Sequence, residues 1–424
     1  MKDIKIVIVG AGSTYTPELV EGLIKRKDSL KVSEVVLMDI DAEKLEIVGG
    51  LAERMIRAAG LGWIVSFSSD LSCIGGADYV MTQMRVGRLP ARILDEKIPL
   101  KHGLIGQETC GIGGFFKAMR TIPVLFEIAD VIKRTAPNAV MINFTNPSGI
   151  VAEALKRKDI RSIGLCNGPF YMEKSVKEKI GIEGLETEYV GLNHLAWITA
   201  ARCGGKDYLK DALESGIESA AMKNIPATGF GIELLKTVKA IPSSYLEYYY
   251  FKHEKLASLK AESLSRGEVC QQLETALLMK YRDPSLTIKP PELEKRGGAH
   301  YSEVAVNLVD AIHNDKKNRH IINIRNNGTL DFLDKDDIIE TPAMVGKKTE
   351  KPIKIKGFSN PHVIAAMRTM KDYEKMAVEA IISGSKESMI RALMQNPLCD
   401  DYRAVKACFE AHGNAMNSIK GISL

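Results

Sequence analysis

Short apolar runs alternate with amphipathic stretches over the first 170 residues of the chain. The first run ends in Val7, Ile8 and Val9, a β-branched segment typical of a strand buried on both faces of a parallel sheet. Apolar residues then recur at helical spacing after Pro17. Further strand patterns occupy 35–41, 64–67, 77–81, 139–144 and 162–165, and a long amphipathic helix pattern covers 115–133. This alternation predicts a doubly wound, Rossmann-like parallel sheet over residues 1–170.

The pattern becomes mixed over residues 171–424, which predicts a second domain of the α+β class. An Asn326-Asn327-Gly328 sequence predicts a turn. Short strand patterns lie at 188–190, 197–200 and 320–325, and helix patterns lie at 302–312, 363–382 and 387–394. We expect a ligand site between the two domains, where clefts most often form.

A glycine-rich turn follows the first strand. Gly10 permits a tight turn, and Gly12 lets the backbone approach a pyrophosphate held at the start of the next helix. Thr16 followed by Pro17 predicts the N-cap and first residue of that helix. Tyr15 replaces the third glycine of the dinucleotide-binding fingerprint, so an ordinary strand-turn-helix remains an alternative.

An acidic residue ends the second predicted strand. Asp39 directly follows the apolar run, at the place where an acid normally binds the ribose hydroxyls of NAD. The alternative is a helix-capping aspartate, because the Asp41-Ala42-Glu43 sequence opens the next helix.

Polar residues follow each later strand. Ligands of doubly wound folds bind at the carboxyl edge of the sheet, so these segments are expected to converge there. They are 83–88, the glycine-rich loop 106–114, 143–148, 166–169 and 191–194. Cys166 and His194 are 28 residues apart, which is not a zinc-finger spacing. Considered alone, the cysteine is typical of a small buried side chain and the histidine of a structural one.

Composition narrows the class of protein. The 424 residues carry a net charge of +5 without a block of lysine or arginine, which argues against nucleic acid as a partner. Seven cysteines, an odd number without the spacing of a disulfide framework, indicate a reducing cytoplasm. No apolar run approaches the roughly 20 residues that span a bilayer, and the N-terminus is already strand-like. We expect a cytoplasmic protein with no membrane partner and no signal peptide.

Eight segments together resemble the family 4 glycoside hydrolases, the NAD- and divalent-metal-dependent 6-phospho-glycosidases. Among these the chain looks most like the 6-phospho-β-glucosidases. The segments span about three quarters of the chain and are GAGSTYTPELVEGLIKR (10–26), QMRVGRLPAR (83–92), IPLKHGLIGQETCGIGG (98–114), INFTNPSG (142–149), GLCNGP (164–169), GLNHL (191–195), PSSYLEYYY (242–250) and KRGGAHYS (295–302). The resemblance implies a fold similar to lactate and malate dehydrogenases and a homodimer or homotetramer.

The resemblance also implies roles for individual residues. Cys166 and His194 would hold Mn²⁺ or another divalent transition metal, which suits a thiolate and an imidazole better than Mg²⁺ does. Tyr245 would be the catalytic base, although Tyr248 is the next candidate and aromatic packing is the alternative for both. Residues expected to bind NAD are Gly10, Gly12, Ser13, Thr14, Asp39, Gln83 and Asn143, and residues expected to bind the substrate are Arg85, Asn146, Asn167, Arg266 and Arg296. Arg92 is a further candidate for the phosphate, and Glu108 for assisting the leaving group.

The implied substrate is a phosphorylated disaccharide or aryl glucoside. NAD would take hydride from C3 of the sugar, Tyr245 would remove the C2 proton, the aglycone would leave by elimination, and water addition and hydride return would follow. Three alternatives stay open: a relative that acts on α-linked or non-phosphorylated sugars, a lactate/malate-type NAD-dependent dehydrogenase, and a non-catalytic NAD-sensing protein.

Overall fold

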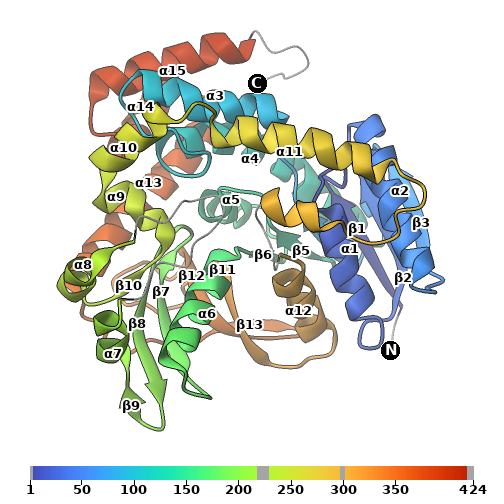
Figure 1. The fold of residues 1–424 in the computed structure, drawn as a ribbon, viewed down its shortest axis with the longest axis horizontal. Helices are drawn as coiled ribbons and strands as arrows, with labels where there is room; N and C mark the ends of the chain where they lie inside the picture. Colours follow the sequence, from blue (N-terminus) through green and yellow to red (C-terminus); the bar gives the residue numbers. More distant parts are fainter. Residues whose placement is uncertain (1–2, 217–228, 297–300, 418–424) are drawn as a thin grey trace.

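A single mixed sheet of 13 strands runs through the molecule (Figure 1). The computed structural model describes residues 3–216, 229–296 and 301–417. The main path of the sheet has the order β10-β8-β7-β12-β11-β6-β5-β4-β1-β2-β3, with β13 beside β12 and β9 beside β8. Within the described residues, no helix is long and apolar enough to cross a membrane.

The first half of the sheet is parallel and confirms the predicted Rossmann-like arrangement. Its strands are β1 (Ile4–Val9), β2 (Val32–Met38), β3 (Ile64–Ser68), β4 (Tyr79–Thr82), β5 (Val140–Asn143) and β6 (Ser162–Gly164). Ile6 and Ile8 pack on one face of the sheet with α1 (Thr16–Lys25), α2 (Ala42–Ala58) and α12 (Tyr301–His313). Val7 and Val9 pack on the other face with α4 (Gly111–Thr135) and α5 (Ser148–Leu155). The central strand is therefore buried on both faces, as its unbroken apolar run predicts.

The first helix begins one residue earlier than its sequence predicts. Tyr15, not Thr16, is the N-cap of α1, and its side chain makes no capping hydrogen bond. Thr16 instead donates its hydroxyl proton to the carbonyl oxygen of Ala11 at 2.8 Å, because the turn folds back over the helix start. The expected N-cap role of Thr16 is therefore wrong, and this side chain holds the glycine turn closed.

The second half mixes helices and strands, as expected, but its strands extend the same sheet in the antiparallel sense. These strands are β7 (Glu186–Leu192), β8 (Leu195–Cys203), β9 (Lys206–Asp207), β10 (Ile241–Pro242), β11 (Asn318–Arg325), β12 (Ile338–Gly346) and β13 (Thr349–Pro352). β11 joins β6 through the pair Asn323 and Gly164, and β12 joins β7 through Glu340 and Gly191. Asn327 and Gly328 have positive φ values and form the predicted turn after β11.

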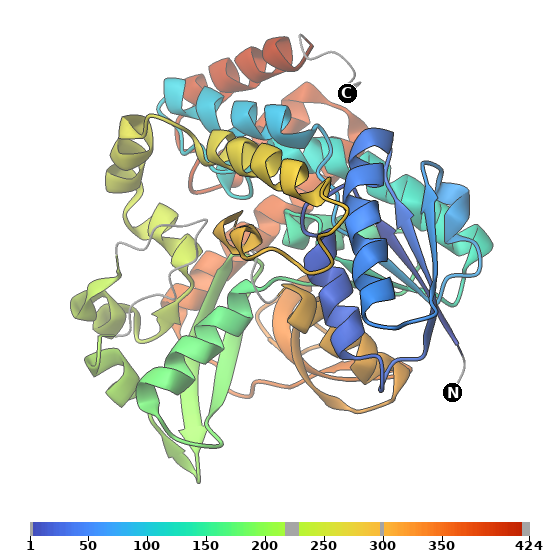
Figure 2. The same ribbon diagram turned by 45° about the vertical axis from the view of Figure 1, so that its right-hand side comes forward.

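Helices cover the carboxyl edge of the parallel strands. In Figures 1 and 2, α11 (Arg266–Tyr281) runs between α3 (Arg88–Lys101) and α2, and it contacts both. The remaining long helices are α6 (Gly168–Ile180), α10 (Lys252–Ala261), α13 (Pro361–Ser383), α14 (Lys386–Gln395) and α15 (Tyr402–Asn417), and the shorter ones are α7 (Leu209–Glu214), α8 (Gly231–Val238), α9 (Glu247–Tyr250), η1 (Leu71–Ile74), η2 (Ser244–Leu246) and η3 (Pro291–Arg296). The domain boundary predicted between residues 170 and 171 falls inside α6.

Candidate functional site

The glycine turn after β1 has the close approaches that require glycine. Gly10 has φ +89°, and an added Cβ would lie 2.7 Å from the backbone N and Cα of Met84. A Cβ on Gly12 would lie 2.9 Å from Oδ2 of Asp39, which accepts a hydrogen bond from the Gly12 N–H at 2.8 Å. Asp39 is thus one of the neighbours that restrict this position to glycine.

The two aspartates after β2 have separate roles. Asp41 caps α2, since its Oδ1 accepts from the N–H of Lys44 at 3.2 Å. Asp39 caps no helix: its two carboxylate oxygens accept from the N–H groups of Gly12 and Asp41, at 2.8 and 2.9 Å. Burial raises the pKa of the Asp39 carboxyl, and these hydrogen bonds oppose the shift. The helix-capping alternative therefore belongs to Asp41, and Asp39 ties the end of β2 to the glycine turn.

The other residues expected to bind NAD surround the same turn. Gln83 donates to the Thr16 hydroxyl oxygen at 2.8 Å. Asn143 is buried, and its amide accepts from the Thr82 hydroxyl and donates to the Thr145 carbonyl oxygen, so it fixes the ends of β4 and β5. Ser13 accepts from the N–H of Tyr15 at 3.3 Å. Ser13 and Gln83 therefore bond to the glycine turn and the helix start, where a pyrophosphate would meet backbone N–H groups, whereas Asn143 holds the neighbouring strand ends.

Cys166 lies directly after β6 at the start of α6. Its sulfur accepts hydrogen bonds from the backbone N–H groups of Asn167 and Gly168, the latter at 3.4 Å, and from the Asn193 side chain. Burial and the charge of Glu340 raise the pKa of this thiol to about 12. The N–H groups at the helix start would stabilise a thiolate once a cation offsets the cost of burial.

His194 and Tyr245 face each other across the site. His194 occupies the tight turn between β7 and β8 with φ 65°, and its ring stacks on the Tyr245 ring at 3.6 Å between centroids and an angle of 11°. Burial, aided by Lys117, lowers the pKa of His194 to about 3, so its imidazole is neutral at physiological pH. Nδ1 of His194 is buried and has no hydrogen-bond partner among the described residues.

These features fit a metal ion held by Cys166 and His194. Asn193, which directly precedes His194, bonds the Cys166 sulfur, so the two candidate ligands are neighbours in space. The neutral imidazole of His194, with a buried nitrogen that has no hydrogen-bond partner among the described residues, is in the form that binds metal ions. Within the described residues, no three His, Cys, Asp or Glu side chains gather as a ready ligand set. A metal ion here would therefore take its remaining ligands from substrate or water.

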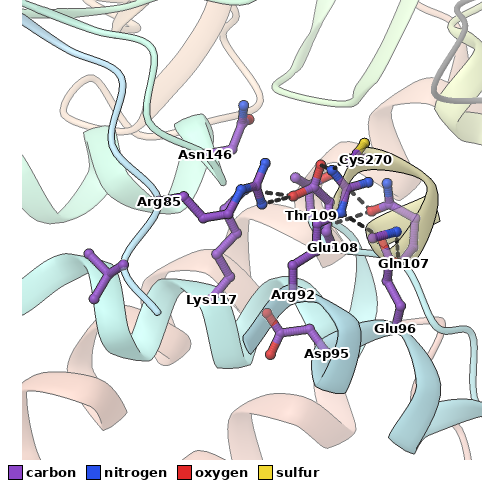
Figure 3. Close-up of polar contacts among 12 residues, drawn as sticks. Arg85, Arg92, Asp95, Glu96, Gln107, Glu108, Thr109, Lys117, Asn146 and Cys270 are labelled. Carbon is purple, nitrogen blue, oxygen red and sulfur yellow. Dashed lines mark hydrogen bonds and ion pairs between the residues drawn. The ribbon is translucent and has the colours of Figure 1, made fainter. Parts of the chain in front are cut away.

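Three cations surround one carboxylate next to this pair. Glu108, from the glycine-rich loop, lies between Arg85 and Arg92, with Lys117 of α4 on the same side chain (Figure 3). Oε1 of Glu108 is 3.1 Å from Arg92 and Oε2 is 3.0 Å from Lys117, and Arg85 also pairs with Oε2. Although burial raises the pKa of Glu108, the three cations outweigh it and hold the pKa well below its ordinary value. Glu108 is therefore ionised at neutral pH, which argues against a role as acid for the leaving group.

The remaining expected substrate residues fall into two places. Asn146 lies near Arg85 in Figure 3, and Asn167 precedes α6 beside Cys166. Arg296 contacts the NAD turn instead, because it donates to the Thr14 hydroxyl oxygen and stacks on the Tyr15 ring at 4.6 Å. Arg266 donates to the carbonyl oxygen of Arg296 at 2.8 Å. Residues 297–300 of the KRGGAHYS segment lie outside the described residues.

Sequence reasoning missed three residues at this edge of the sheet. Asn193 stands inside the GLNHL segment, so its place before His194 was a usable signal. Lys117 is one charged residue in an otherwise apolar helix start, and Glu340 is one acid in a strand. The position of Glu340 depends on strand pairing between distant segments, which no local pattern reveals.

Comparison with known proteins identifies the family. The model of the family 4 glycosyl hydrolases matches residues 5–182, and the model of their C-terminal domain matches residues 189–399. The chain belongs to family 4 of the glycosyl hydrolases. It is 42% identical to a probable 6-phospho-beta-glucosidase of Bacillus subtilis (94% of this chain, 92% of the relative) and 39% identical to the 6-phospho-beta-glucosidase of Escherichia coli (93% and 91%).

A solved structure supports the same relationship. The 6-phospho-beta glucosidase of Thermotoga maritima with manganese, NAD⁺ and glucose-6-phosphate is 31% identical, with a TM-score of 0.89 over 98% of both chains. A lactate dehydrogenase from a deep-sea metagenome library has a TM-score of 0.55 at 16% identity, over 90% of this chain and 100% of the other. The expected likeness to lactate and malate dehydrogenases is thus confirmed at the level of the fold.

Proposed function

We propose that this protein hydrolyses 6-phospho-β-glucosides to glucose 6-phosphate and the free aglycone, with NAD and a divalent metal ion, Mn²⁺ or a similar one, as cofactors. The observation that carries the proposal is the trio of Cys166, His194 and Tyr245. A neutral imidazole whose buried Nδ1 has no hydrogen-bond partner among the described residues stacks on a phenol ring, and a buried thiol lies close by. The family and the named relatives point to the same activity.

Each part of the edge has a task in this reaction. The turn from Gly10 to Thr14 and the Asp39 carboxylate would hold the dinucleotide, and Cys166 and His194 would hold the metal ion. When bound, NAD supplies reversible hydride transfer at C3 of the sugar, and the divalent ion supplies Lewis-acid activation of the neighbouring C2 proton. Tyr245 accepts that C2 proton, and the aglycone leaves C1 by elimination. Addition of water to the unsaturated sugar and return of the hydride to C3 would complete a hydrolysis with no net oxidation.

The cations around Glu108 suit a phosphorylated sugar. Arg85, Arg92 and Lys117 face two carboxylates, Glu108 and Glu96, so one positive charge remains to attract a phosphate when Lys117 is protonated. Asn146 and Asn167 would orient sugar or phosphate oxygens. Arg296, which contacts the glycine turn, and Arg266, which donates to the Arg296 carbonyl oxygen, would reach the substrate only where it approaches the dinucleotide.

A panel of nitrophenyl glucosides tests the substrate. The α- and β-anomers, each with and without a 6-phosphate, are assayed with NAD⁺, Mn²⁺ and a thiol reductant. We expect hydrolysis of the β-anomer with phosphate and incorporation of deuterium at C2 when the solvent is D₂O. Preference for the α-anomer would assign a 6-phospho-α-glucosidase. Release of NADH with an intact glycoside would assign a dehydrogenase and refute the proposal.

Two tyrosine variants test the base. Tyr245→Phe keeps the ring that stacks on His194 and removes the hydroxyl, so we expect kcat to fall about 10²- to 10⁴-fold. Tyr248→Phe is the matched control, since Tyr248 lies in the buried cluster with Ile105, Cys110 and Leu398. The reverse pattern would move the base to Tyr248, and full activity of both variants would refute a tyrosine base.

Location and assembly complete the proposal. All seven cysteines are free thiols, which is typical of a reducing cytoplasm, where phosphorylated sugars are also found. A homodimer or homotetramer is proposed from the family resemblance. Light scattering after size-exclusion chromatography measures the assembly directly, and a monomer at micromolar concentration would contradict it.

A further inference from the structure

Four residues form a line across the junction of the two halves of the sheet. Gly164 of β6 pairs with Asn323 of β11, Asn323 pairs with Glu340 of β12, and Glu340 pairs with Gly191 of β7. Cys166 follows Gly164 by two residues, and His194 follows Gly191 by three. Glu340 therefore sits on the central hairpin, between the strand ends that carry the two candidate metal ligands.

Glu340 is a buried carboxylate with neutral partners. It is 1% exposed, and its oxygens accept from the Asn193 amide at 3.1 Å, the Asn323 amide at 3.0 Å and the Tyr189 hydroxyl. Among the residues that the structure describes, no lysine, arginine or histidine forms an ion pair with it. Burial raises the pKa of Glu340, and a cation close by would favour its ionised form, because a buried charge is normally paired with a cation or a metal.

Asn193 connects this carboxylate to both candidate ligands. Its amide donates to Glu340, its side chain bonds the sulfur of Cys166, and its Oδ1 accepts from the N–H of Gly149 at 3.4 Å. His194 is the next residue, in a left-handed turn conformation that needs external support. The orientation of this turn thus depends on what holds Asn193.

We propose that Glu340 is a positioning residue for the divalent metal ion: it orients the Asn193–His194 turn and supplies negative charge that the two ligands lack. A thiolate and a neutral imidazole offer one negative charge to a divalent cation, and the Glu340 carboxylate supplies a second without entering the ligand set. Outer partners of this kind orient metal ligands and tune metal affinity. The inference rests on the metal site of the proposed function.

Mn²⁺ binding to the full chain, without substrate, tests the inference. Glu340→Gln keeps the side-chain shape and removes the charge. Titration followed by the electron paramagnetic resonance signal of free Mn²⁺ should give a Kd raised about 10- to 100-fold. Glu340→Asp keeps the charge and should recover part of the lost Mn²⁺ affinity. A purely structural role for Glu340 would not predict this recovery. Asp337→Asn is the matched control, because Asp337 is buried near the same strand start but pairs with Lys375.

Two further variants separate the possible failures. Cys166→Ala should abolish tight Mn²⁺ binding; wild-type affinity there would refute the metal site itself, and with it this part of the proposed function. If Cys166→Ala loses the metal ion while Glu340→Gln binds it as the wild type does, only the role of Glu340 is refuted. If Glu340→Gln does not fold by circular dichroism, Asn193→Ala takes its place. That variant cuts the link and leaves the carboxylate, and unchanged Mn²⁺ affinity in it overturns the inference.

Discussion

The carboxylate of Glu108 is expected to be the strongest electrostatic contact in the candidate site. Its side chain is 12% exposed, and those of Arg92 and Lys117 are 6% and 4% exposed. At 3.1 and 3.0 Å, each pair has a gross attraction of about 5 kcal/mol at an effective dielectric constant of about 20. Much of this attraction offsets the cost of burying the charges. Removal of Glu108, however, leaves that cost without compensation.

Glu108→Gln should therefore destabilise the protein by about 3–5 kcal/mol. Part of the cost can be relieved, because burial and the charge of Arg85 already lower the pKa of Lys117 to about 7. In the variant Lys117 loses its proton near neutral pH, and the two arginines remain as the unpaired charges. The loss of stability should therefore be larger at pH 6 than at pH 8.

Urea unfolding measures this loss. The midpoint can be followed by circular dichroism and by the fluorescence of Trp63 and Trp197 at both pH values. Glu127→Gln, an exposed change on α4, is the control. At pH 8, addition of Lys117→Met to Glu108→Gln should cost little more than Glu108→Gln alone. Midpoints for Glu108→Gln equal to the wild type at both pH values would refute the reasoning.

Three further predictions concern the dinucleotide turn and Lys117. Gly10→Ala places a Cβ 2.7 Å from the Met84 backbone at φ +89°, so stability should fall by about 1–3 kcal/mol and calorimetry should detect weaker NAD binding. Asp39→Asn loses one of two hydrogen bonds to backbone N–H groups, and NAD affinity should fall on the order of tenfold; unchanged affinity would contradict the assigned role. The lowered pKa of Lys117 means that the unfolded chain binds more protons between pH 7 and 10.5, so stability rises across this range. Lys117→Met should flatten that rise in urea midpoints, and an identical pH slope would contradict it.

The parallel half of the fold was predictable because each strand is local and apolar. Strands β1, β4 and β5 are buried on both faces, so short unbroken runs mark them without knowledge of their neighbours, whereas the edge strand β3 exposes Ile64 and Phe67. The insertion of β11 and β12 between β6 and β7 was not predictable, since it joins segments more than 100 residues apart in the sequence. The sequence therefore indicated two domains, but not that the strands of both join in one continuous sheet.

The sequence predicted those candidate site residues whose side-chain chemistry and place at the end of a strand both pointed to a ligand. Cys166 follows β6, at the edge where a doubly wound sheet places ligands, whereas His194 lies in a hairpin turn of the antiparallel half, and strand pairing across the sheet brings it to this edge. The assignment of Arg296 to the substrate could not anticipate its stacking on Tyr15, because that contact depends on how η3 folds back over the first turn. Likewise Glu340 has the appearance of a solvent-facing acid in a strand, and its burial depends on pairing with both Asn323 and Gly191.

The hairpin of β11 and β12 has a consequence for variation within this fold. In a strand, successive side chains point to opposite faces, so a slip of one residue in pairing reverses every side chain. A single deletion between Asn326 and Asp337 that shifted β12 by one position would put Ile339 or Thr341 in place of Glu340. A change of length in this loop therefore leaves Glu340 in place only if it preserves the pairing register of β12. A segment that contributes no ligand would then decide whether a chain of this family keeps its metal ion.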